Sequence, residues 1–420
     1  MNEPKSASKP FAIPKQMVME AFRKVRANKG GPGVDGCSIE EFEADLRNRL
    51  YVTWNRMSSG SYFPPPVKLV EIPKAHGEGV RGLGVPTVAD RVAQTVVAIE
   101  LEKSVEPMFH PSSYGYRPGR SPEQAVAACR ERCFTHPWVL DCDIQGFFDN
   151  VPHDLIVKAV EANTSEPWVV LYVKRWLQAP VQHPDGTLEH RDRGTPQGSA
   201  ISPLLANMFM HYAFDAWMER EFPTVAFERY CDDFVVHCFS EKQAWYLRKR
   251  IESRLGECGL RLHPDKTRIV FCQQDGREGS YEHTSFTFLG FTFRKRAVKG
   301  PEGAMFNGFL PAVSNDAMRK MSRTLHSWRL HRQTTRSLND LATWVNRIVS
   351  GWINYYGRFY PSALIPLLRR INAYIVRWAQ KKYKRLRSFK RADAWWRGIT
   401  SRDPLLFTHW RHTTGYWMTG

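Results

Sequence analysis

Two adjacent aspartates stand in front of an apolar run in the middle of the chain, in "RYCDDFVVHC" (229–238). The bulky apolar residues after them favour a strand, so the acids are expected near the tip of a hairpin. Two carboxylates in such a place repel each other, and burying either one unpaired costs several kcal/mol. Asp232 and Asp233 therefore indicate either a solvated turn or a site for a divalent cation, which takes oxygen ligands.

The positive charge of the chain is concentrated near its end. The formal net charge is +18, from 60 Lys+Arg and 42 Asp+Glu. Residues 311–420 hold 21 Lys+Arg and 4 Asp+Glu, or +17, which leaves +1 for residues 1–310. Eight of the 14 tryptophans lie in the same basic region. This distribution predicts a nucleic-acid-binding region joined to a body of balanced charge.

Several classes of protein are disfavoured by simple signals. The eight cysteines lack the paired spacing of a zinc site, which favours reduced structural thiols. We find neither a secretory signal nor an apolar run of about 18 residues, which a membrane span needs. The sequence therefore predicts a cytoplasmic protein without a membrane partner.

The hydrophobic pattern predicts a mixed α+β body followed by an all-helical region. Residues 1–15 are expected to form a loose arm, and two strands flank "AHGEG" (75–79). A helix over 38–54 opens with a capping box of Ser38 and Glu41, and "FTFLGFTFRK" (286–295) reads as one strand. From about residue 311 only helical spacing remains, as in the apolar residues Leu364, Leu367, Leu368, Ile371, Ile375 and Trp378.

A third carboxylate lies in the short strand predicted over "WVLDCDI" (138–144). Asp141 and Asp143 alternate with apolar residues, so both carboxylates point to one side of the strand. An acid inside an apolar strand is costly without a partner. Together with Asp232 and Asp233, this strand resembles the palm of a template-directed polymerase, in which such acids hold two Mg²⁺ ions about 4 Å apart.

Further motifs follow in the order found in reverse transcriptases, over roughly residues 28 to 291: "EIPKAHGEGVRGLGVP", "YGYRPGRS", "GTPQGSAISPLLAN", "LRLHPDKT" and "FLGF". "ANKGGPGVDG" (27–36) and "GWINYYGRFY" (351–360) resemble segments of bacterial group II intron-encoded reverse transcriptase–maturases. The resemblance implies a right-hand polymerase with fingers and palm over 16–300. It also implies a helical thumb or maturase (X) domain over 308–387 and a short basic, Trp-rich segment over 388–420. No cysteine follows Cys272, so we expect the zinc-braced H-N-H nuclease domain of many members to be absent.

The resemblance assigns roles to individual residues. Asp143, Asp232 and Asp233 are predicted to be catalytic and to hold two Mg²⁺, with the backbone carbonyl of Ile144 as a further ligand. The predicted nucleotide-binding residues are Lys74, Arg81, Ile144, Phe148, Gln197 and Lys266. The predicted nucleic-acid-binding residues are Arg117, Arg120, Gly198, Arg369, Arg370, Arg377, Lys381, Lys382, Lys384 and Arg385.

Some of these residues have a plainer interpretation, and one position departs from the family. Basic residues on a hairpin, such as Lys74 and Arg81, are often merely solvated, and Lys266 can form a surface salt bridge. Phe148 can be a core aromatic; placed under the sugar, its ring would exclude a 2′-hydroxyl and select deoxynucleotides. The family usually has alanine where Cys231 stands, and because cysteine is nearly as small, the site geometry is expected to survive.

The implied partners are a group II intron RNA, an RNA template with a DNA primer, a DNA target and deoxynucleoside triphosphates. A bacterial location in the cytoplasm, at the nucleoid when DNA is bound, goes with them. Two alternatives stay open at this point. One is a host-adapted relative that acts in DNA repair or phage defence, and the other is a splicing cofactor whose polymerase site is idle.

Overall fold

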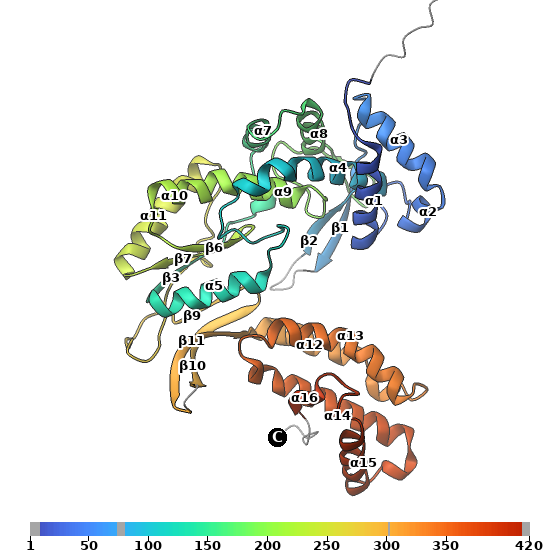
Figure 1. The fold of residues 1–420 in the computed structure, drawn as a ribbon, viewed down its shortest axis with the longest axis vertical. Helices are drawn as coiled ribbons and strands as arrows, with labels where there is room; N and C mark the ends of the chain where they lie inside the picture. The colour runs from blue at the N-terminus through green and yellow to red at the C-terminus, as the bar shows by residue number, and fades with distance from the viewer. Residues whose placement is uncertain (1–8, 74–79, 301–302, 414–420) are drawn as a thin grey trace, which may run out of the picture. The chain divides into compact units, whose positions relative to one another are not determined.

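The computed structural model describes residues 9–73, 80–300 and 303–413, and it confirms the α+β class (Figure 1). The chain forms two compact units, residues 1–125 with 140–269 and residues 126–139 with 270–420. The first boundary between the two units, between residues 125 and 126, falls within α5 (Pro122–Thr135). Among the described residues, no helix combines the length and the apolar character that crossing a membrane would require.

The first unit opens with helices α1 (Lys15–Asn28), α2 (Ile39–Ala44) and α3 (Leu46–Ser58). The predicted capping box is confirmed at the start of α2. Ser38 Oγ accepts a hydrogen bond from the Glu41 N–H at 3.1 Å, and the Glu41 carboxylate accepts one from the Ser38 N–H at 2.8 Å. The buried face of α1 packs against α4 (Val88–Val105), in which ten of the 18 residues are buried.

The predicted hairpin around residues 75–79 is formed by β1 (Val67–Pro73) and β2 (Val80–Val85), which pair antiparallel from Lys68 opposite Val85. Two short strands, β4 (Val181–Gln182) and β5 (Leu188–Glu189), extend this sheet to the order β2-β1-β4-β5. Helices α7 (His153–Glu161) and α8 (Pro167–Leu177) precede these short strands in the chain. This sheet carries the predicted fingers.

A second four-stranded sheet has the order β6-β7-β3-β8. Its strands are β6 (Phe227–Tyr230), β7 (Asp233–Cys238), β3 (Trp138–Cys142) and β8 (Arg268–Phe271). Helix α11 (Glu241–Glu257) packs on β7, whose residues after Asp233 are all buried. Helix α9 (Ser202–Met210) continues through a π-helical turn (His211–Asp215) into α10 (Ala216–Glu221). This sheet carries the acidic hairpin.

The second unit contains a three-stranded sheet of order β11-β10-β9, with β9 (Ser285–Phe288), β10 (Phe291–Lys299) and β11 (Met305–Val313). The prediction of one strand over 286–295 is wrong, because the chain reverses between β9 and β10. Leu289 and Gly290 have φ angles of +50° and +80°. Two consecutive residues with positive φ are typical of the tightest hairpin turns, and glycine adopts this conformation without strain.

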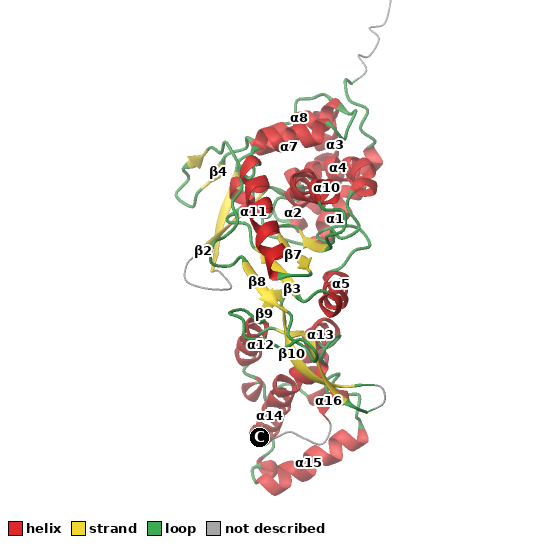
Figure 2. Ribbon diagram, turned by 90° about the vertical axis from the view of Figure 1, so that its left-hand side faces the viewer, coloured by secondary structure: helices red, strands yellow, loops and turns green. Residues whose placement is uncertain are grey.

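Helices dominate the rest of the second unit, as Figure 2 shows for α12 (Asn315–Ser327), α13 (Leu338–Tyr356), α14 (Ile365–Lys382), α15 (Phe389–Arg402) and α16 (Trp410–Thr413). The apolar face predicted from residue 364 to residue 378 is buried throughout. Trp396, Phe407 and Trp410 lie in the same hydrophobic core. The structure therefore does not separate the Trp-rich segment from the helical region at residue 388.

Candidate active site

The turn of the acidic hairpin consists of Cys231 and Asp232, because Tyr230 of β6 pairs with Asp233 of β7. Cys231 is buried and has a φ of +62°, which is uncommon for a residue other than glycine. Gly115 lies against this turn so closely that a Cβ there would stand 2.6 Å from the Cys231 nitrogen. A small residue at 231 and a glycine at 115 together fix the backbone that presents the two acids.

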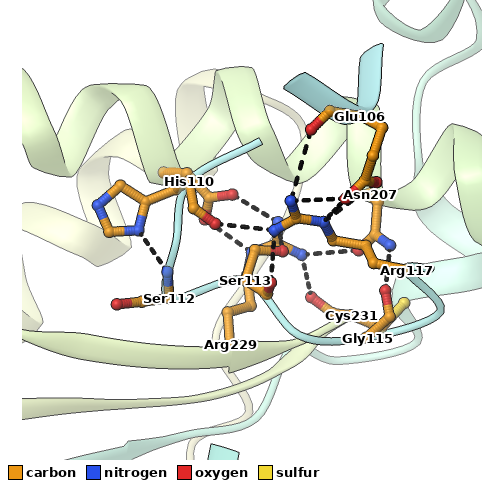
Figure 3. A network of polar contacts seen from close by, with 10 residues as sticks. Glu106, His110, Ser112, Ser113, Gly115, Arg117, Asn207, Arg229 and Cys231 are labelled. Atoms are coloured by element: carbon orange, nitrogen blue, oxygen red, sulfur yellow. Dashed lines mark hydrogen bonds and ion pairs between the residues drawn. The ribbon is translucent and has the colours of Figure 1, made fainter. Parts of the chain in front are cut away.

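Arg229 holds this turn from inside the fold (Figure 3). Its side chain is fully buried, and its guanidinium donates two hydrogen bonds to the Asp215 carboxylate, one of them at 2.7 Å. It also donates to Asn207 Oδ1 at 3.0 Å, to Ser113 Oγ at 2.8 Å and to the Cys231 carbonyl at 2.9 Å. All five N–H donors of the guanidinium are used, so the buried charge is fully satisfied.

The predicted nucleic-acid contact of Arg117 is corrected by its placement (Figure 3). The side chain is buried, forms an ion pair with Glu106 at 2.8 Å and donates to the carbonyls of His110 at 2.9 Å and Ser113 at 2.6 Å. Arginine presents several donors at once, which suits it to holding a loop together. Arg117 therefore supports the segment that carries Ser113. Arg120, by contrast, is exposed.

Asp143 follows the last residue of β3, the strand next to β7 in the sheet. Its carboxylate forms an ion pair with Lys266 at 3.2 Å, and both side chains reach solvent. Its carbonyl accepts a hydrogen bond from the His263 N–H at 2.7 Å. Burial raises the pKa of the Cys142 thiol, and the charge of Asp233 contributes to that shift. Asp143 thus directly follows β3, and Asp233 begins β7, the neighbouring strand of the same sheet.

Asp141 behaves differently from Asp143. Burial raises the pKa of Asp141 to about 7, an effect that Arg268 opposes and the charge of Asp143 reinforces. The desolvation of a carboxyl group favours its neutral form. We therefore interpret Asp141 as a structural residue.

The donor set fits a divalent cation. Asp143, Asp232 and Asp233 supply carboxylate oxygens that are partly exposed, and such hard ligands suit Mg²⁺. The Lys266 ammonium group already lies beside Asp143, so a cation can approach that carboxylate. Ile144 is buried opposite Leu262. Ile144 and Leu262 form an antiparallel β-bridge. Its hydrogen bonds use the carbonyl of Asp143 and the N–H of Gln145.

The loop that contains Gln197 and Gly198 packs on the finger hairpin. The Gly84 N–H of β2 donates to the Gln197 carbonyl at 2.7 Å, and a Cβ on Gly198 would stand 2.6 Å from the Gly84 carbonyl oxygen. From α4, the buried Gln94 side chain accepts hydrogen bonds from Ser199 Oγ at 2.7 Å and from the next backbone N–H at 2.8 Å. The loop is therefore held at a fixed distance from β2.

The two basic residues predicted on the finger hairpin are placed only in part. Lys74 lies outside the described residues. Arg81 lies in β2, where its backbone pairs opposite Ile72. Their predicted contact with a triphosphate stays a prediction.

Phe148 is the partly exposed member of a phenylalanine pair in α6 (Phe147–Asn150). Phe147 is buried and packs on Phe209 with ring centroids 6.1 Å apart. The Phe148 carbonyl accepts a hydrogen bond from the Thr195 N–H at 2.7 Å. The core position at this turn is therefore taken by Phe147, and the Phe148 ring keeps an exposed face.

The basic residues predicted in the second unit fall into two groups. Arg377, Lys381, Lys384 and Arg385 are exposed, and the first two line a pocket of about 560 Å³. Arg370 is also exposed but donates to Ser322 Oγ at 3.1 Å, whereas Arg369 and Lys382 are partly buried and Lys382 donates to the Arg336 carbonyl.

Comparison with known families decides the identity. The family described as "Reverse transcriptase (RNA-dependent DNA polymerase)" matches residues 72–293. The chain belongs to the reverse transcriptase family. The "Group II intron, maturase-specific domain" matches residues 318–396, so this reverse transcriptase also carries a maturase domain. The RNA-directed DNA polymerase and maturase predicted from the sequence are both confirmed at the level of the family.

Individual proteins are also similar to this chain. Protein YkfC of Escherichia coli is 30% identical over 327 residues, which are 68% of this chain and 82% of YkfC. The group II intron-encoded protein LtrA of Lactococcus lactis is 31% identical over 196 residues, 46% of this chain but only 32% of LtrA. Among solved structures, telomerase from Candida albicans matches with a TM-score of 0.43 and 12% identity, over 88% of this chain and 66% of that one.

The residues that hold the acidic hairpin in place were not predicted from the sequence. Arg229, Asp215 and Asn207 come from separate elements, and their spacing along the chain follows no recognised motif. One signal was available. Glu228 and Arg229 are charged residues between Phe227 and Tyr230 in one short strand, and a charge buried in such a strand needs a partner of opposite sign.

Proposed function

We propose that this reverse transcriptase copies an RNA template from a DNA primer at a site formed by Asp143, Asp232 and Asp233, with two Mg²⁺ ions. We further propose that its basic helical region binds group II intron RNA as a maturase and assists splicing and intron mobility. The observation that supports the polymerase site most strongly is the acidic turn presented by β6 and β7 in the same sheet as β3, the strand that Asp143 directly follows.

In the proposed reaction, the primer 3′-oxygen bonds to the α-phosphorus of a deoxynucleoside triphosphate while the bond from that phosphorus to the bridging oxygen breaks. Pyrophosphate leaves, and the proton of the hydroxyl passes to solvent. The three carboxylates would hold the Mg²⁺ ions, whose chemistry is to neutralise phosphate charge and to lower the pKa of the attacking hydroxyl.

The protein's own groups supply position. Arg229 fixes the carbonyl of Cys231 and with it the turn that carries Asp232 and Asp233. Lys266, which pairs with Asp143, is proposed to contact the triphosphate. The ring of Phe148 is proposed to lie under the sugar and to exclude a 2′-hydroxyl. The loop at Gln197 is proposed to lie against the templating base pair.

The test is to replace Asp143 or Asp232 with alanine. We expect Mg²⁺-dependent extension of a DNA primer on an RNA template to fall at least about 100-fold, because each variant removes a metal ligand. The affinity for intron RNA, measured by filter binding, should stay near that of the wild type, because the excess positive charge lies elsewhere. Asp154→Ala, which removes an exposed acid from α7, is the matched control. Near-normal extension by Asp143→Ala would contradict the assignment.

The maturase proposal is tested separately. The +17 charge of residues 311–420 favours RNA binding through phosphates. The wild type should bind a folded group II intron RNA and raise its splicing rate at low Mg²⁺. Binding without any effect on splicing would leave this region as a general nucleic-acid-binding surface.

A further inference from the structure

A pocket of about 560 Å³ lies in the second unit between the end of α12, the turn that follows it, and α14. Arg329, Arg377, Lys381 and Arg387 are exposed around it. No aspartate or glutamate is among the described residues that line it. The turn is attached to α14 by a hydrogen bond of 2.9 Å from the Trp378 indole N–H to the Gln333 carbonyl. We call it the basic pocket.

The inner part of the basic pocket is apolar and aromatic. Leu325 and Leu330, which line it, are almost completely buried. Tyr374 also lines it, with the Arg377 guanidinium 5.6 Å from the centre of its ring. Pockets of this size hold small organic groups against apolar and aromatic side chains. The basic pocket therefore offers a flat ring to a planar ligand and cations to the groups around it.

The cations of the basic pocket repel one another. Burial lowers the pKa of His331, and Lys381, Arg332 and Arg377 lower it further through their charges. The few acids of residues 311–420 are placed elsewhere: Asp316 pairs with Arg319 at 2.9 Å, and Asp393 pairs with Arg397 at 2.9 Å. Like charges gathered without an acid favour an anionic ligand, and phosphate is the anion that nucleic acids offer.

We propose that the basic pocket takes one unpaired nucleotide of the bound RNA, with its base on the Tyr374 ring and its flanking phosphates on Arg329, Arg377, Lys381 and Arg387. This inference rests on the proposed RNA-binding function and adds to it a site for a single-stranded position. A duplex keeps its bases stacked and would contact only the rim. Base stacking on an aromatic side chain is the usual way in which proteins bind single strands.

The test compares an unstructured oligouridylate with a blunt RNA duplex of equal length, both bound to the full chain. Tyr374→Leu should weaken the oligouridylate about 5- to 150-fold, the equivalent of 1–3 kcal/mol for one stacked base, and the duplex less than about twofold. Tyr374→Phe keeps the ring and should bind as the wild type does. Arg377→Gln with Lys381→Gln should lower the salt slope for the oligouridylate by about 1.4, or about 0.7 for each phosphate.

Lys320→Gln with Arg323→Gln is the matched control, since it removes two exposed charges from α12 outside the pocket. Pocket variants that behave like this control would overturn the proposal. So would a Tyr374→Leu variant that weakens both RNAs equally, which would indicate duplex binding through phosphates alone. Binding by the wild type is measured first. If neither RNA binds, the proposed RNA-binding function is wrong. If the wild type binds and the variants do not show the expected loss, only the pocket proposal is wrong.

Discussion

Arg229 offers the sharpest test of how the active-site turn is held. Arg229→Met removes five buried hydrogen bonds and leaves Asp215 as a buried charge without its partner. Breaking such a pair from one side costs about 3–5 kcal/mol. Replacing both members with apolar residues of similar volume is often neutral, so Arg229→Met with Asp215→Leu should recover most of the lost stability.

Activity should not recover with stability in the double variant. The Cys231 carbonyl would still lack its donor, so the turn that carries Asp232 would lose a restraint. We expect primer extension to stay at least about tenfold below the wild type, the equivalent of about 1.4 kcal/mol for one misplaced or lost hydrogen bond.

The assays are urea unfolding and single-turnover primer extension on an RNA template. Arg26→Met, which breaks an exposed pair with Glu43, is the control and should change stability by less than about 1 kcal/mol. A double variant that regains both stability and extension would refute the positioning role. A single Arg229→Met variant as stable as the control would refute the energetic argument.

Three further outcomes are expected. Phe148→Val should admit matched ribonucleotides, as measured by incorporation of each nucleotide type, and unchanged discrimination would assign the ring to packing alone. Gly115→Ala should destabilise the fold by about 1–3 kcal/mol and slow extension, because its Cβ would meet the Cys231 nitrogen, whereas Gly351→Ala has open space and should be tolerated. His409 is buried with a pKa lowered to about 3 against an ordinary 6.5, so the unfolded chain binds the proton between these values. Stability should therefore fall as pH drops from about 6.5 toward 3, by at most about 1.4 kcal/mol per pH unit from this group, and His409→Gln should remove that contribution from the urea midpoints.

The sequence predicted the elements whose signals are local. The capping box of Ser38 and Glu41, the strands around residues 75–79 and the buried face of α14 all depend on neighbours within a few positions. The acidic hairpin was also predicted, because the bulky apolar residues that follow Asp232 and Asp233 favour a strand.

What the sequence did not predict depends on contacts between distant residues. The sequence does not tell a buried arginine of a loop from an exposed one, so Arg117 was predicted to bind nucleic acid, and its side chain instead pairs with Glu106. The burial of His409 is likewise not apparent from the residues around it. It stands in a histidine-containing basic segment, yet its ring hydrogen-bonds Asn372 in the core of the helical region. Neither partner is near in the sequence, and no local pattern distinguishes these side chains from solvated ones.

The second unit is formed from two segments that the ribosome synthesises at well-separated times. Residues 126–139 belong to that unit, although the rest of it begins at residue 270. Arg277 donates to the carbonyl of Cys133 at 3.0 Å, across 144 positions of sequence, and so closes the end of α5. At a synthesis rate of 5–20 residues per second, Arg277 is added to the chain about 7–30 s after Cys133. No single cut of the chain yields two complete halves, so fragments of this enzyme should be made together or refolded together.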